Sequence, residues 1–551
     1  MTVKRDRGNL LVVGGPAGLS EALEALLDPR TNGKSIARDE SLAQSGGAEP
    51  PLAAASGRPV IMLSPNPERD ECESWLNDTR EIFAQTPTAH VVLLSSMEVY
   101  SPDHHSLGMV EENAERRPTV SNARAEFWEA AEAGIQEFLP ADQLLILRSA
   151  HVIGHWAEGW FNRLLRRKLA VTVMGYDPSI QLIHETDFVR AVHSALENRL
   201  TGVYNVASRD ALPLRKILQA CSVRRLPLPW ALLRLRRRAS FAPADRSAYL
   251  RYSCTGCGAR FARETEIGLS TVRALEQFLG EKGTSSLDLA DYSDPHGLDA
   301  PFINRAAKGR FKFLEKAYWR IERTGFEHIP DRGPAILVGP HRGFMPVDAV
   351  MLVQMVTNYT KRVPRFLLHP SLVKLPILAR FMRRMGGVMA CKKNANGLLE
   401  RGELLGIYPE GIRGPFKYYK DVYDLGRFGR PDYALFALEH AAPVIPFVIV
   451  GCAEIYPIFG KLKWNWVKKI LEWPCLPITP TFPFLPFPLP TKWHLQILPP
   501  IEPARAIEEA ERTGREPCQV IVEQVKTSIQ RATSEMLEKR KSIFFGSVFA
   551  E

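Results

Sequence analysis

Cysteine is scarce in this sequence, and long hydrophobic runs are missing. The chain has 551 residues but only 8 cysteines, which argues against a disulfide-stapled secreted domain and favours a reducing compartment. The longest apolar stretch, residues 441–453, contains two prolines, whereas a helix that crosses a bilayer needs about 20 apolar residues. Near the amino terminus, Gly14, Gly15 and Pro16 end a short apolar run too early for a signal peptide. We therefore expect a cytoplasmic protein without a membrane-spanning helix.

Sequence patterns typical of metal sites are also scarce. Cys254 and Cys257 form a single CxxC pair, and no second pair accompanies it. Structural zinc sites almost always have four ligands. The pair therefore predicts an ordinary loop, and we expect no metal site.

Charge is unevenly shared between the two halves of the chain. Hydrophobic residues make up 45% and charged residues 24%, which are ordinary values for globular domains. Of the net charge of +10, residues 1–300 contribute 34 basic and 38 acidic side chains, and residues 301–551 contribute 37 and 23. The basic second half indicates a phosphorylated substrate, a phospholipid surface or nucleic acid, unless it is simply a solvated basic surface.

Apolar runs alternate with helical patterns through both halves, which is typical of α/β domains with parallel sheets. No internal repeat is visible. A polar, turn-rich stretch separates the halves, so we expect a first domain over 1–282, a linker over 283–305 and a second domain over 306–545. The expected strands are 10–13, 60–63, 90–94, 144–147, 335–338, 365–368, 387–390, 404–408 and 444–450; the expected helices include 20–27, 123–138 and one charged helix near 505–541. A Ser/Ala/Gly/Pro-rich stretch over 30–57 predicts a disordered loop.

Glycines follow the first expected strand and precede a helix, in the pattern Gly14-Gly15-Pro16-Ala17-Gly18. Further along come Ser95-Ser96-Met97-Glu98-Val99-Tyr100 and then His184-Glu-Thr-Asp187. Together these pieces resemble the extended short-chain dehydrogenase/reductase family, of the NAD-dependent epimerase/dehydratase type, over about residues 8–280. The resemblance implies a Rossmann-like parallel sheet and an NAD(P) site in which Gly14, Gly15 and Gly18 approach the pyrophosphate.

The first domain departs from that family at its proton-transfer pair. The tyrosine and lysine of the family's Tyr-x-x-x-Lys pattern fall on Val120 and Arg124, and valine cannot transfer a proton. The acidic residue that would hold the adenosine ribose falls in the irregular 30–57 stretch. We expect a degenerate domain that is no longer an oxidoreductase; nucleotide binding and a docking role both stay open.

A histidine and an aspartate stand seven positions apart in Val338-Gly-Pro-His341-Arg-Gly-Phe-Met-Pro-Val-Asp348. A carboxylate beside an imidazole can hold its tautomer and stabilise the imidazolium that forms when it takes a proton. Gly343 and Pro346 predict a loop that can fold the acid back onto the histidine. An incidental surface pair is the alternative.

Two further motifs follow in order. Leu404-Leu-Gly-Ile-Tyr408-Pro409-Glu410-Gly411-Ile412-Arg413-Gly414 is an apolar strand ending in a turn, and Ala442-Pro443-Val444-Ile445-Pro446 leads into another strand. With His341 and Asp348, these motifs resemble the glycerolipid acyltransferase family over about residues 310–505. The six residues between His341 and Asp348 resemble its monoacylglycerol/diacylglycerol acyltransferase-like branch.

The resemblance implies acyl transfer from a thioester to an alcohol. It makes His341 and Asp348 the catalytic pair, Glu410, Gly411 and Arg413 the acceptor site, and Pro443 and Pro446 the wall beside the acyl chain. The donor would be acyl-CoA or an acyl-carrier protein, with no other cofactor and no covalent acyl-enzyme. The family's second motif is unclear around Cys391, Lys392 and Lys393, so the acceptor stays open among lysophosphatidic acid, other lysophospholipids and mono- or diacylglycerols.

Residues 461–490 are the expected membrane contact. Indoles favour the headgroup boundary and lysines are attracted to anionic lipid; the segment holds Lys461, Lys463, Lys468, Lys469, Trp464, Trp466, Trp473 and a proline-rich, uncharged end. A proline-rich arm packed on the domain is the alternative reading. We expect peripheral membrane association and no nucleic-acid partner. Two other functions stay open: a bifunctional enzyme with an active reductase/epimerase domain, and a non-enzymatic membrane adaptor. The oligomeric state and acyl-chain length are not predicted.

Overall fold

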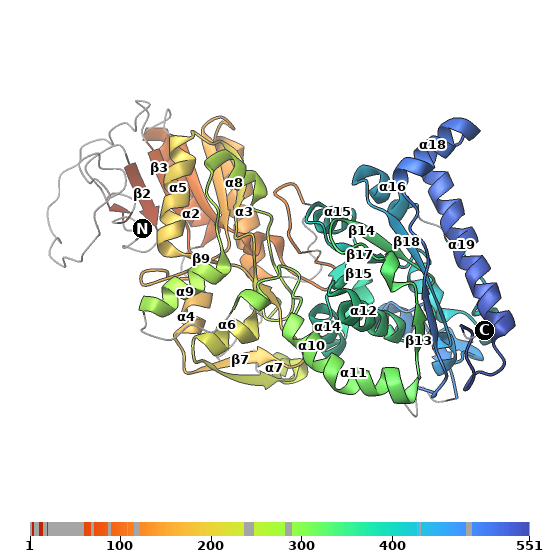
Figure 1. Cartoon of the computed structure of the whole chain (residues 1–551). Helices are drawn as coiled ribbons and strands as arrows, with labels where there is room; N and C mark the ends of the chain where they lie inside the picture. The colour runs from red at the N-terminus through yellow and green to blue at the C-terminus, as the bar shows by residue number, and fades with distance from the viewer. Residues whose placement is uncertain are drawn as a thin grey trace. The chain divides into compact units, whose positions relative to one another are not determined.

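The computed structural model divides the chain into two compact units, Met1–Gly297 and Leu298–Glu551 (Figure 1). It describes residues 3–4, 10–14, 19, 22, 60–67, 71–85, 90–106, 108–114, 122–235, 247–281, 289–426, 428, 431–480 and 488–549. The expected helix at 20–27, the 30–57 stretch and Val120 therefore lie wholly or mainly outside the described residues.

The amino-terminal unit is built on a parallel sheet. Its strands lie in the order β2-β3-β4-β5-β10, with the short β1 antiparallel at the edge beside β2. Their bounds are β1 Val3–Lys4, β2 Leu10–Gly14, β3 Val60–Ser64, β4 His90–Ser96, β5 Leu144–Ser149 and β10 Gly202–Val206. The four strands expected here are confirmed as β2 to β5.

Both faces of this sheet are covered by helices, because its strands are apolar on both sides. Along β4, Val92 and Leu94 pack into one core cluster and Val91 and Leu93 into another, as the two-residue period of a strand requires. The helices are α2 Cys72–Gln85 and α3 Ala123–Phe138 on the second of these faces, and α5 Glu185–Glu197 and α8 Ala259–Thr265 on the first. This is the expected Rossmann-like α/β arrangement.

A smaller cluster extends the same unit. Three short strand pairs, β6–β9, β7–β12 and β8–β11, surround a core shared with α4, α6 and α9. Their bounds are β6 His151–Ile153, β7 Leu169–Val173, β8 Ser179–Ile180, β9 Leu182–His184, β11 Leu212–Pro213, β12 Arg224–Leu228, α4 Trp160–Leu165, α6 Leu214–Ala220 and α9 Thr271–Glu281.

The carboxy-terminal unit has a mixed sheet in the order β13-β21-β18-β14-β17-β15-β16. The five strands from β18 to β16 are parallel, and β21 runs antiparallel to β18. Their bounds are β13 Glu322–Thr324, β14 Ala335–Val338, β15 Pro364–Leu368, β16 Val388–Met389, β17 Leu404–Ile407, β18 Val444–Val450 and β21 His494–Ile497. All five strands expected in this half are present, and the α/β fold class is confirmed.

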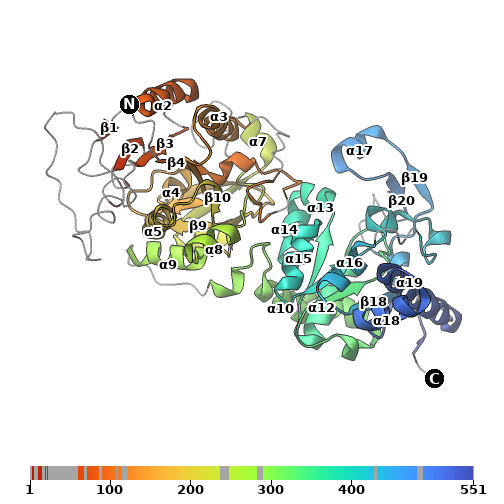
Figure 2. The same ribbon diagram turned by 90° about the horizontal axis from the view of Figure 1, so that it is seen from above.

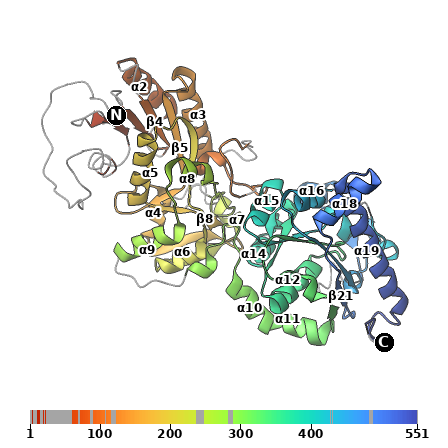
Figure 3. The same ribbon diagram turned by 45° about the horizontal axis from the view of Figure 1, so that its top comes forward.

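Helices cover this second sheet on both faces (Figure 3). On one face α12 and α14 pack against Leu337, Leu404 and Phe447; on the other, Val338, Leu405 and their neighbours meet α15, α16, α18 and α19. The bounds are α10 Ala300–Lys308, α12 Val347–Thr360, α14 Pro376–Arg384, α15 Lys392–Glu400, α16 Asp432–Glu439, α18 Pro503–Thr513 and α19 Pro517–Lys539.

The prediction of a single helix over about 505–541 is wrong. Gly514 adopts φ +68°, a left-handed conformation that ends α18, and Pro517 begins α19. The two helices pack against each other, and Val520, Val525 and Ile529 of α19 pack onto the sheet.

Candidate active site

The predicted catalytic motifs meet at the carboxyl edge of the second sheet. Strands β14 and β17 are parallel neighbours, and their last residues, Val338 and Ile407, are paired. The loops that follow them carry His341 and Glu410. In open α/β sheets ligands bind beyond the carboxyl ends of the strands, so the edge beyond β14 and β17 is the place to look for a site.

His341 and Asp348 are in direct contact. Nδ1 of His341 lies 2.8 Å from Oδ2 of Asp348, and the aspartate is 1% exposed. The carboxylate also accepts the backbone N–H groups of Arg342 at 3.1 Å and Ala349 at 2.8 Å. Since Asp348 is the second residue of α12, its negative charge is further stabilised by the helix amino terminus. The carboxylate is thus held to receive Nδ1–H, which leaves Nε2 as the basic nitrogen of the imidazole.

The loop between His341 and Asp348 folds back at Gly343. Gly343 has φ +101°, and a Cβ there would lie 3.0 Å from the carbonyl oxygen of Cys452. Only glycine therefore fits this close approach without strain. The turn brings the start of α12 beneath His341.

Aromatic stacking fixes the plane of the imidazole. The His341 ring stacks on Tyr408, with centroids 4.4 Å apart, and Tyr408 stacks on Phe366 at 5.0 Å. Burial raises the pKa of Tyr408 well above its ordinary value, so this phenol stays neutral. Its hydroxyl has no hydrogen-bond partner among the described residues. Tyr408 therefore acts as a packing surface for the histidine.

The turn after β17 is held together by Glu410. Its Oε1 accepts from Lys417 Nζ and, at 2.9 Å, from the backbone N–H of Gly426, while its buried Oε2 has no partner within the described part of the chain. A Cβ on Gly414 would lie 3.0 Å from both that Oε2 and the carbonyl oxygen of His341. The Glu410 turn thus packs directly against the His341 loop.

The other predicted site residues are Arg413, Pro443 and Pro446, and they do not all lie at the edge that carries His341. Arg413 is exposed and forms no ion pair with any described side chain. Pro446 pairs with Val338 at the end of β14, near His341. Pro443 precedes β18 and its carbonyl accepts from Ile336, toward the amino end of β14. The structure therefore brings Pro446, but not Pro443, to the edge that carries the histidine.

Cys391 lies two residues after β16 and caps α15. Its Sγ accepts from the backbone N–H of Asn394 at 3.4 Å. Lys392 follows with its side chain largely exposed, 3.9 Å from Asp432. The structure gives this segment a helix-capping thiol and an exposed cation at the same edge of the sheet.

The structure also shows a network of buried polar side chains near His341 that the sequence does not predict. The Arg342 guanidinium is buried and donates to the carbonyls of Val422 and Tyr423, and burial lowers the pKa of this arginine. The Tyr423 hydroxyl donates to Glu454 at 2.7 Å, and Glu454 forms a two-point ion pair with Arg540, at 2.5 and 2.7 Å. These contacts connect Arg540, in the segment after α19, to Arg342, the residue next to His341. We call this network of Arg342, Tyr423, Glu454 and Arg540 the tail clamp.

We expect Glu454→Gln to lower turnover at this site without unfolding the chain. Both partners of this ion pair are buried, 5% and 7% exposed, and breaking such a pair costs about 3–5 kcal/mol of stability. Misplacement of a reacting group by about 1 Å can cost up to about 10²-fold in rate. The measurement is kcat, together with the denaturant midpoint, of the purified variant.

Glu523→Gln is the matched control. Glu523 pairs with Arg515 at 2.8 Å, but both side chains are more than half exposed, and exposed pairs contribute little. The tail clamp is refuted as a positioning device if both variants keep the parent kcat.

The glycine motif of the first unit is only partly described. Gly14 ends β2, whereas Gly15 and Gly18 lie outside the described residues. Arg124 forms an ion pair with the buried Glu98, Nε to Oε2 at 2.8 Å. Cys254, of the CxxC pair, donates to the carbonyl of Met97, and burial raises the pKa of its thiol to about 12.

The expected membrane segment forms an arm of the second unit. Strands β19 Gly460–Leu462 and β20 Leu476–Ile478 pair antiparallel and carry α17 Asn465–Leu471 at their tip (Figure 2). Trp473 packs on Phe344, with ring centroids 5.2 Å apart, so this indole belongs to the domain core. Residues 481–487 are outside the described part. No helix among the described residues is long and apolar enough to span a membrane.

Comparison with known proteins assigns the family. The model of the Acyltransferase family matches residues 320–450. An uncharacterized protein of Mycobacterium tuberculosis is 34% identical over 284 residues, which cover 50% of this chain and 76% of the relative. The carboxy-terminal unit therefore contains an acyltransferase-family domain, as the sequence motifs predict. A chicken (Gallus gallus) protein described as a DGAT1/2-independent enzyme synthesizing storage lipids is 26% identical over 223 residues, 40% of this chain and 65% of the relative.

Two solved structures are similar to parts of the chain. A 1-acyl-sn-glycerophosphate acyltransferase, PlsC, from Thermotoga maritima is 19% identical and aligns with 42% of this chain and 81% of its own, with a TM-score of 0.29. A human epimerase family protein with NADPH is 18% identical and aligns with 49% of this chain and 99% of its own, with a TM-score of 0.35.

Proposed function

We propose that the carboxy-terminal unit transfers a fatty acyl group from a thioester, acyl-CoA or acyl-carrier protein, to the hydroxyl of a glycerolipid or lysophospholipid. The observation that carries this proposal is the buried Asp348 carboxylate on Nδ1 of His341, at the edge where Arg413 is exposed. The family assignment and the chicken relative's description support a lipid acceptor.

The chemistry follows from the free nitrogen of the imidazole. Nε2 of His341 takes the proton of the acceptor hydroxyl as its oxygen attacks the thioester carbonyl. The C–S bond then breaks, and the leaving thiolate takes the proton back from the imidazolium. Asp348 stabilises the positive charge between these steps. The products are an ester and a free thiol, and no group on the protein becomes acylated.

The acceptor would lie against the Glu410 turn. Glu410 holds the shape of this turn through Lys417 and Gly426, and Gly411 leaves the backbone open on that side. Arg413 suits a phosphate or another anionic headgroup. An assay of the purified chain with labelled acyl-CoA against lysophosphatidic acid, other lysophospholipids and mono- and diacylglycerols tests the proposal. Absence of ester product with every acceptor, with either donor type, would refute it.

We propose that the arm is the membrane contact. Its exposed apolar side chains are Phe459, Leu462, Trp464 and Ile478, and Lys463, Lys468 and Lys469 are exposed beside them. Lys461 instead lies over the Tyr418 ring at 3.8 Å. Aromatic side chains and lysines together favour the interface of an anionic bilayer.

Replacing Lys463, Lys468 and Lys469 with glutamate should weaken binding to anionic vesicles. Each lysine near such a surface contributes about 1 kcal/mol, and the loss should be largest at low salt, where screening is weak. Co-sedimentation with phosphatidylserine-containing vesicles measures it. The control variant changes Lys526, Lys539 and Lys541, on and just after α19, to glutamate and carries the same net charge. Equal sedimentation of the two variants would place the contact elsewhere.

A further inference from the structure

Four aromatic rings form a cluster at the carboxyl edge of the second sheet. Its central ring, Phe344, lies three residues after His341 and is 5% exposed. The centroid of this ring lies 5.6 Å from that of Phe416, 6.4 Å from that of Tyr456 and 5.2 Å from that of Trp473, and each pair is edge to face. This is a favoured geometry of aromatic pairs, so the cluster anchors the loop that carries His341.

The four rings come from four different segments. Phe344 follows β14, Phe416 is the last residue of the turn that begins after Glu410, and Tyr456 follows β18. Trp473 belongs to the arm, between α17 and β20 (Figure 2). Its indole also lies near Phe416, with ring centroids 6.1 Å apart. One side chain of the arm therefore contacts both loops that form the candidate site.

The other end of the arm is attached beside the Glu410 turn. Just before β19, the carbonyl of Ile458 accepts the backbone N–H of Tyr419 at 3.0 Å. Two residues before Tyr419, the side chain of Lys417 binds the Glu410 carboxylate through Nζ. Both ends of the arm are thus joined to segments that shape the candidate site.

The arm itself is a small element. Its strands, β19 and β20, have three residues each, and a two-stranded hairpin is marginally stable by itself. Its exposed apolar side chains include Phe459 and Trp464, whereas Trp473 is partly buried in the aromatic cluster. A bilayer that binds the exposed side chains favours the position in which the arm is held. Trp473 is placed to pass that constraint to the His341 loop.

We propose that Trp473 is a positioning residue that couples the arm to the His341 loop, so that binding of the arm to an anionic bilayer activates acyl transfer. This inference rests on the proposed function and adds the regulation of that site. The indole acts through Phe344, whose ring fixes the loop between His341 and Asp348. That loop must hold Nε2 of His341 within hydrogen-bond reach of the acceptor hydroxyl, and a displacement of about 1 Å can cost up to about 10²-fold in rate.

Hydrogen exchange of the full chain tests the coupling without an assay of activity. Phosphatidylserine-containing vesicles should slow the exchange of backbone amides over 459–478 and also over 341–348, because a bound arm opens less often and the loop opens with it. In Trp473→Ala the vesicles should still protect 459–478, since the exposed side chains of the arm are unchanged. Residues 341–348 of this variant should exchange at the same rate with and without vesicles.

Steady-state kinetics provide the second readout. With the acceptor in phosphatidylserine vesicles, Trp473→Ala should lower kcat about tenfold, because the loop no longer holds the base in place. The KM for the thioester should change less than about twofold, since the loss falls on the chemical step. Trp473→Phe keeps a ring against Phe344 and should recover most of the parent kcat. In neutral detergent micelles, which do not attract the lysines of the arm, the parent should lose its advantage over Trp473→Ala.

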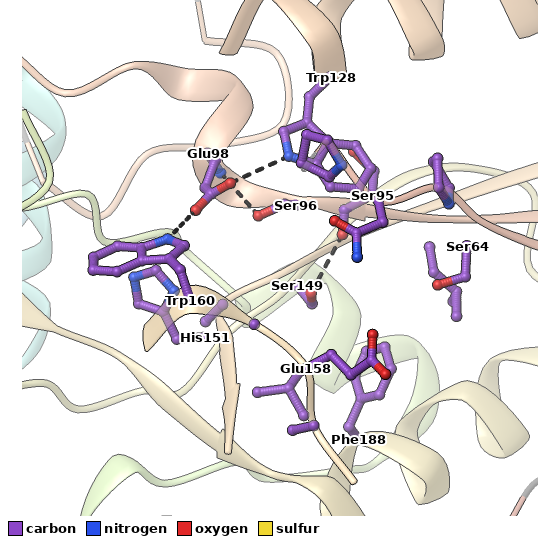
Figure 4. Close-up of a pocket in the computed structure, with 18 of the residues that line it drawn as sticks. Ser64, Ser95, Ser96, Glu98, Trp128, Ser149, His151, Glu158, Trp160 and Phe188 are labelled. Carbon is purple, nitrogen blue, oxygen red and sulfur yellow. Dashed lines mark hydrogen bonds between the residues drawn. The ribbon is translucent and has the colours of Figure 1, made fainter. Parts of the chain in front are cut away.

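Two controls separate the coupling from a loss of stability. Phe326→Ala removes a partly buried ring that packs edge to face on Tyr359, with centroids 5.6 Å apart, about three helical turns along α12 from Asp348. Trp128→Ala removes an indole from the amino-terminal unit, where Nε1 of Trp128 donates to Glu98 at 3.3 Å (Figure 4). Both controls should lower the denaturant midpoint but keep the parent kcat and the parent exchange over 341–348.

Three results would overturn the coupling. The first is exchange over 341–348 that does not respond to vesicles in the parent, although 459–478 is protected. The second is an equal response in the parent and in Trp473→Ala. The third is a loss of kcat in Phe326→Ala as large as that in Trp473→Ala. A parent chain that forms no ester with any acceptor would instead refute the proposed function, and hydrogen exchange would still decide the coupling.

Discussion

Replacement of His341 by alanine is expected to reduce acyl transfer by about 10²–10⁴-fold. Its Nε2 is the basic nitrogen at the carboxyl edge, because Nδ1 is committed to Asp348 at 2.8 Å. The neighbouring aromatic hydroxyl, on Tyr408, has a pKa raised well above its ordinary value by burial and cannot replace the base. The measurement is kcat/KM with saturating thioester, accompanied by a circular dichroism spectrum that should match the parent.

His440→Ala provides the comparison for that loss. His440 follows α16 and contributes nothing to the His341 loop, so this variant should keep the parent rate while losing the same side chain. Parent-like turnover by a folded His341→Ala protein would remove the base from the mechanism.

Asp348→Asn should be nearly as damaging, with kcat lowered by up to about 10⁴-fold. The amide keeps the size of the side chain but loses the charge that stabilises the imidazolium, and it can present N–H to Nδ1 and so favour the wrong tautomer. The substrate does not contact this buried group, so KM should change little. Steady-state kinetics on the purified variant separate the two parameters.

A structural role alone predicts a different result for the same variant. Asp348 also accepts the N–H of Arg342, in the loop before α12, and the N–H of Ala349, in the first turn of this helix. If holding this loop against the helix were its main role, Asp348→Asn would lower the denaturant midpoint and leave kcat within a few-fold of the parent.

Much of the fold could be predicted because strands and helices leave different local patterns. The fully apolar runs at 90–94 and 444–450 predict strands buried on both faces, and β4 and β18 are such strands. The break between α18 and α19 was missed because the charged pattern continues across Gly514 and Pro517, although both residues are local stop and start signals.

The part of the candidate site whose residues are close together in the sequence could be predicted. His341 and Asp348 lie within one loop, and Gly343 and Pro346 indicate that the loop turns back. The tail clamp could not be predicted, since Arg342, Glu454 and Arg540 are brought together only by the sheet order and by the path of the chain after α19. The strand register could not be predicted either: the sequence places Pro443 before the 444–450 strand, but only the structure shows that Pro446 pairs with Val338 at the carboxyl end of β14.

We propose that the second unit moves an acyl group from a thioester to a lipid hydroxyl with His341 as the base. The direct measurement follows labelled acyl-CoA, or acyl-carrier protein, and the acceptor panel in anionic vesicles, counting the ester by chromatography and the released thiol by a chromogenic reagent. We expect one ester for each thiol with the parent chain, and neither product above background with His341→Ala. Thiol release without ester, or equal ester formation by the parent and His341→Ala, would contradict it.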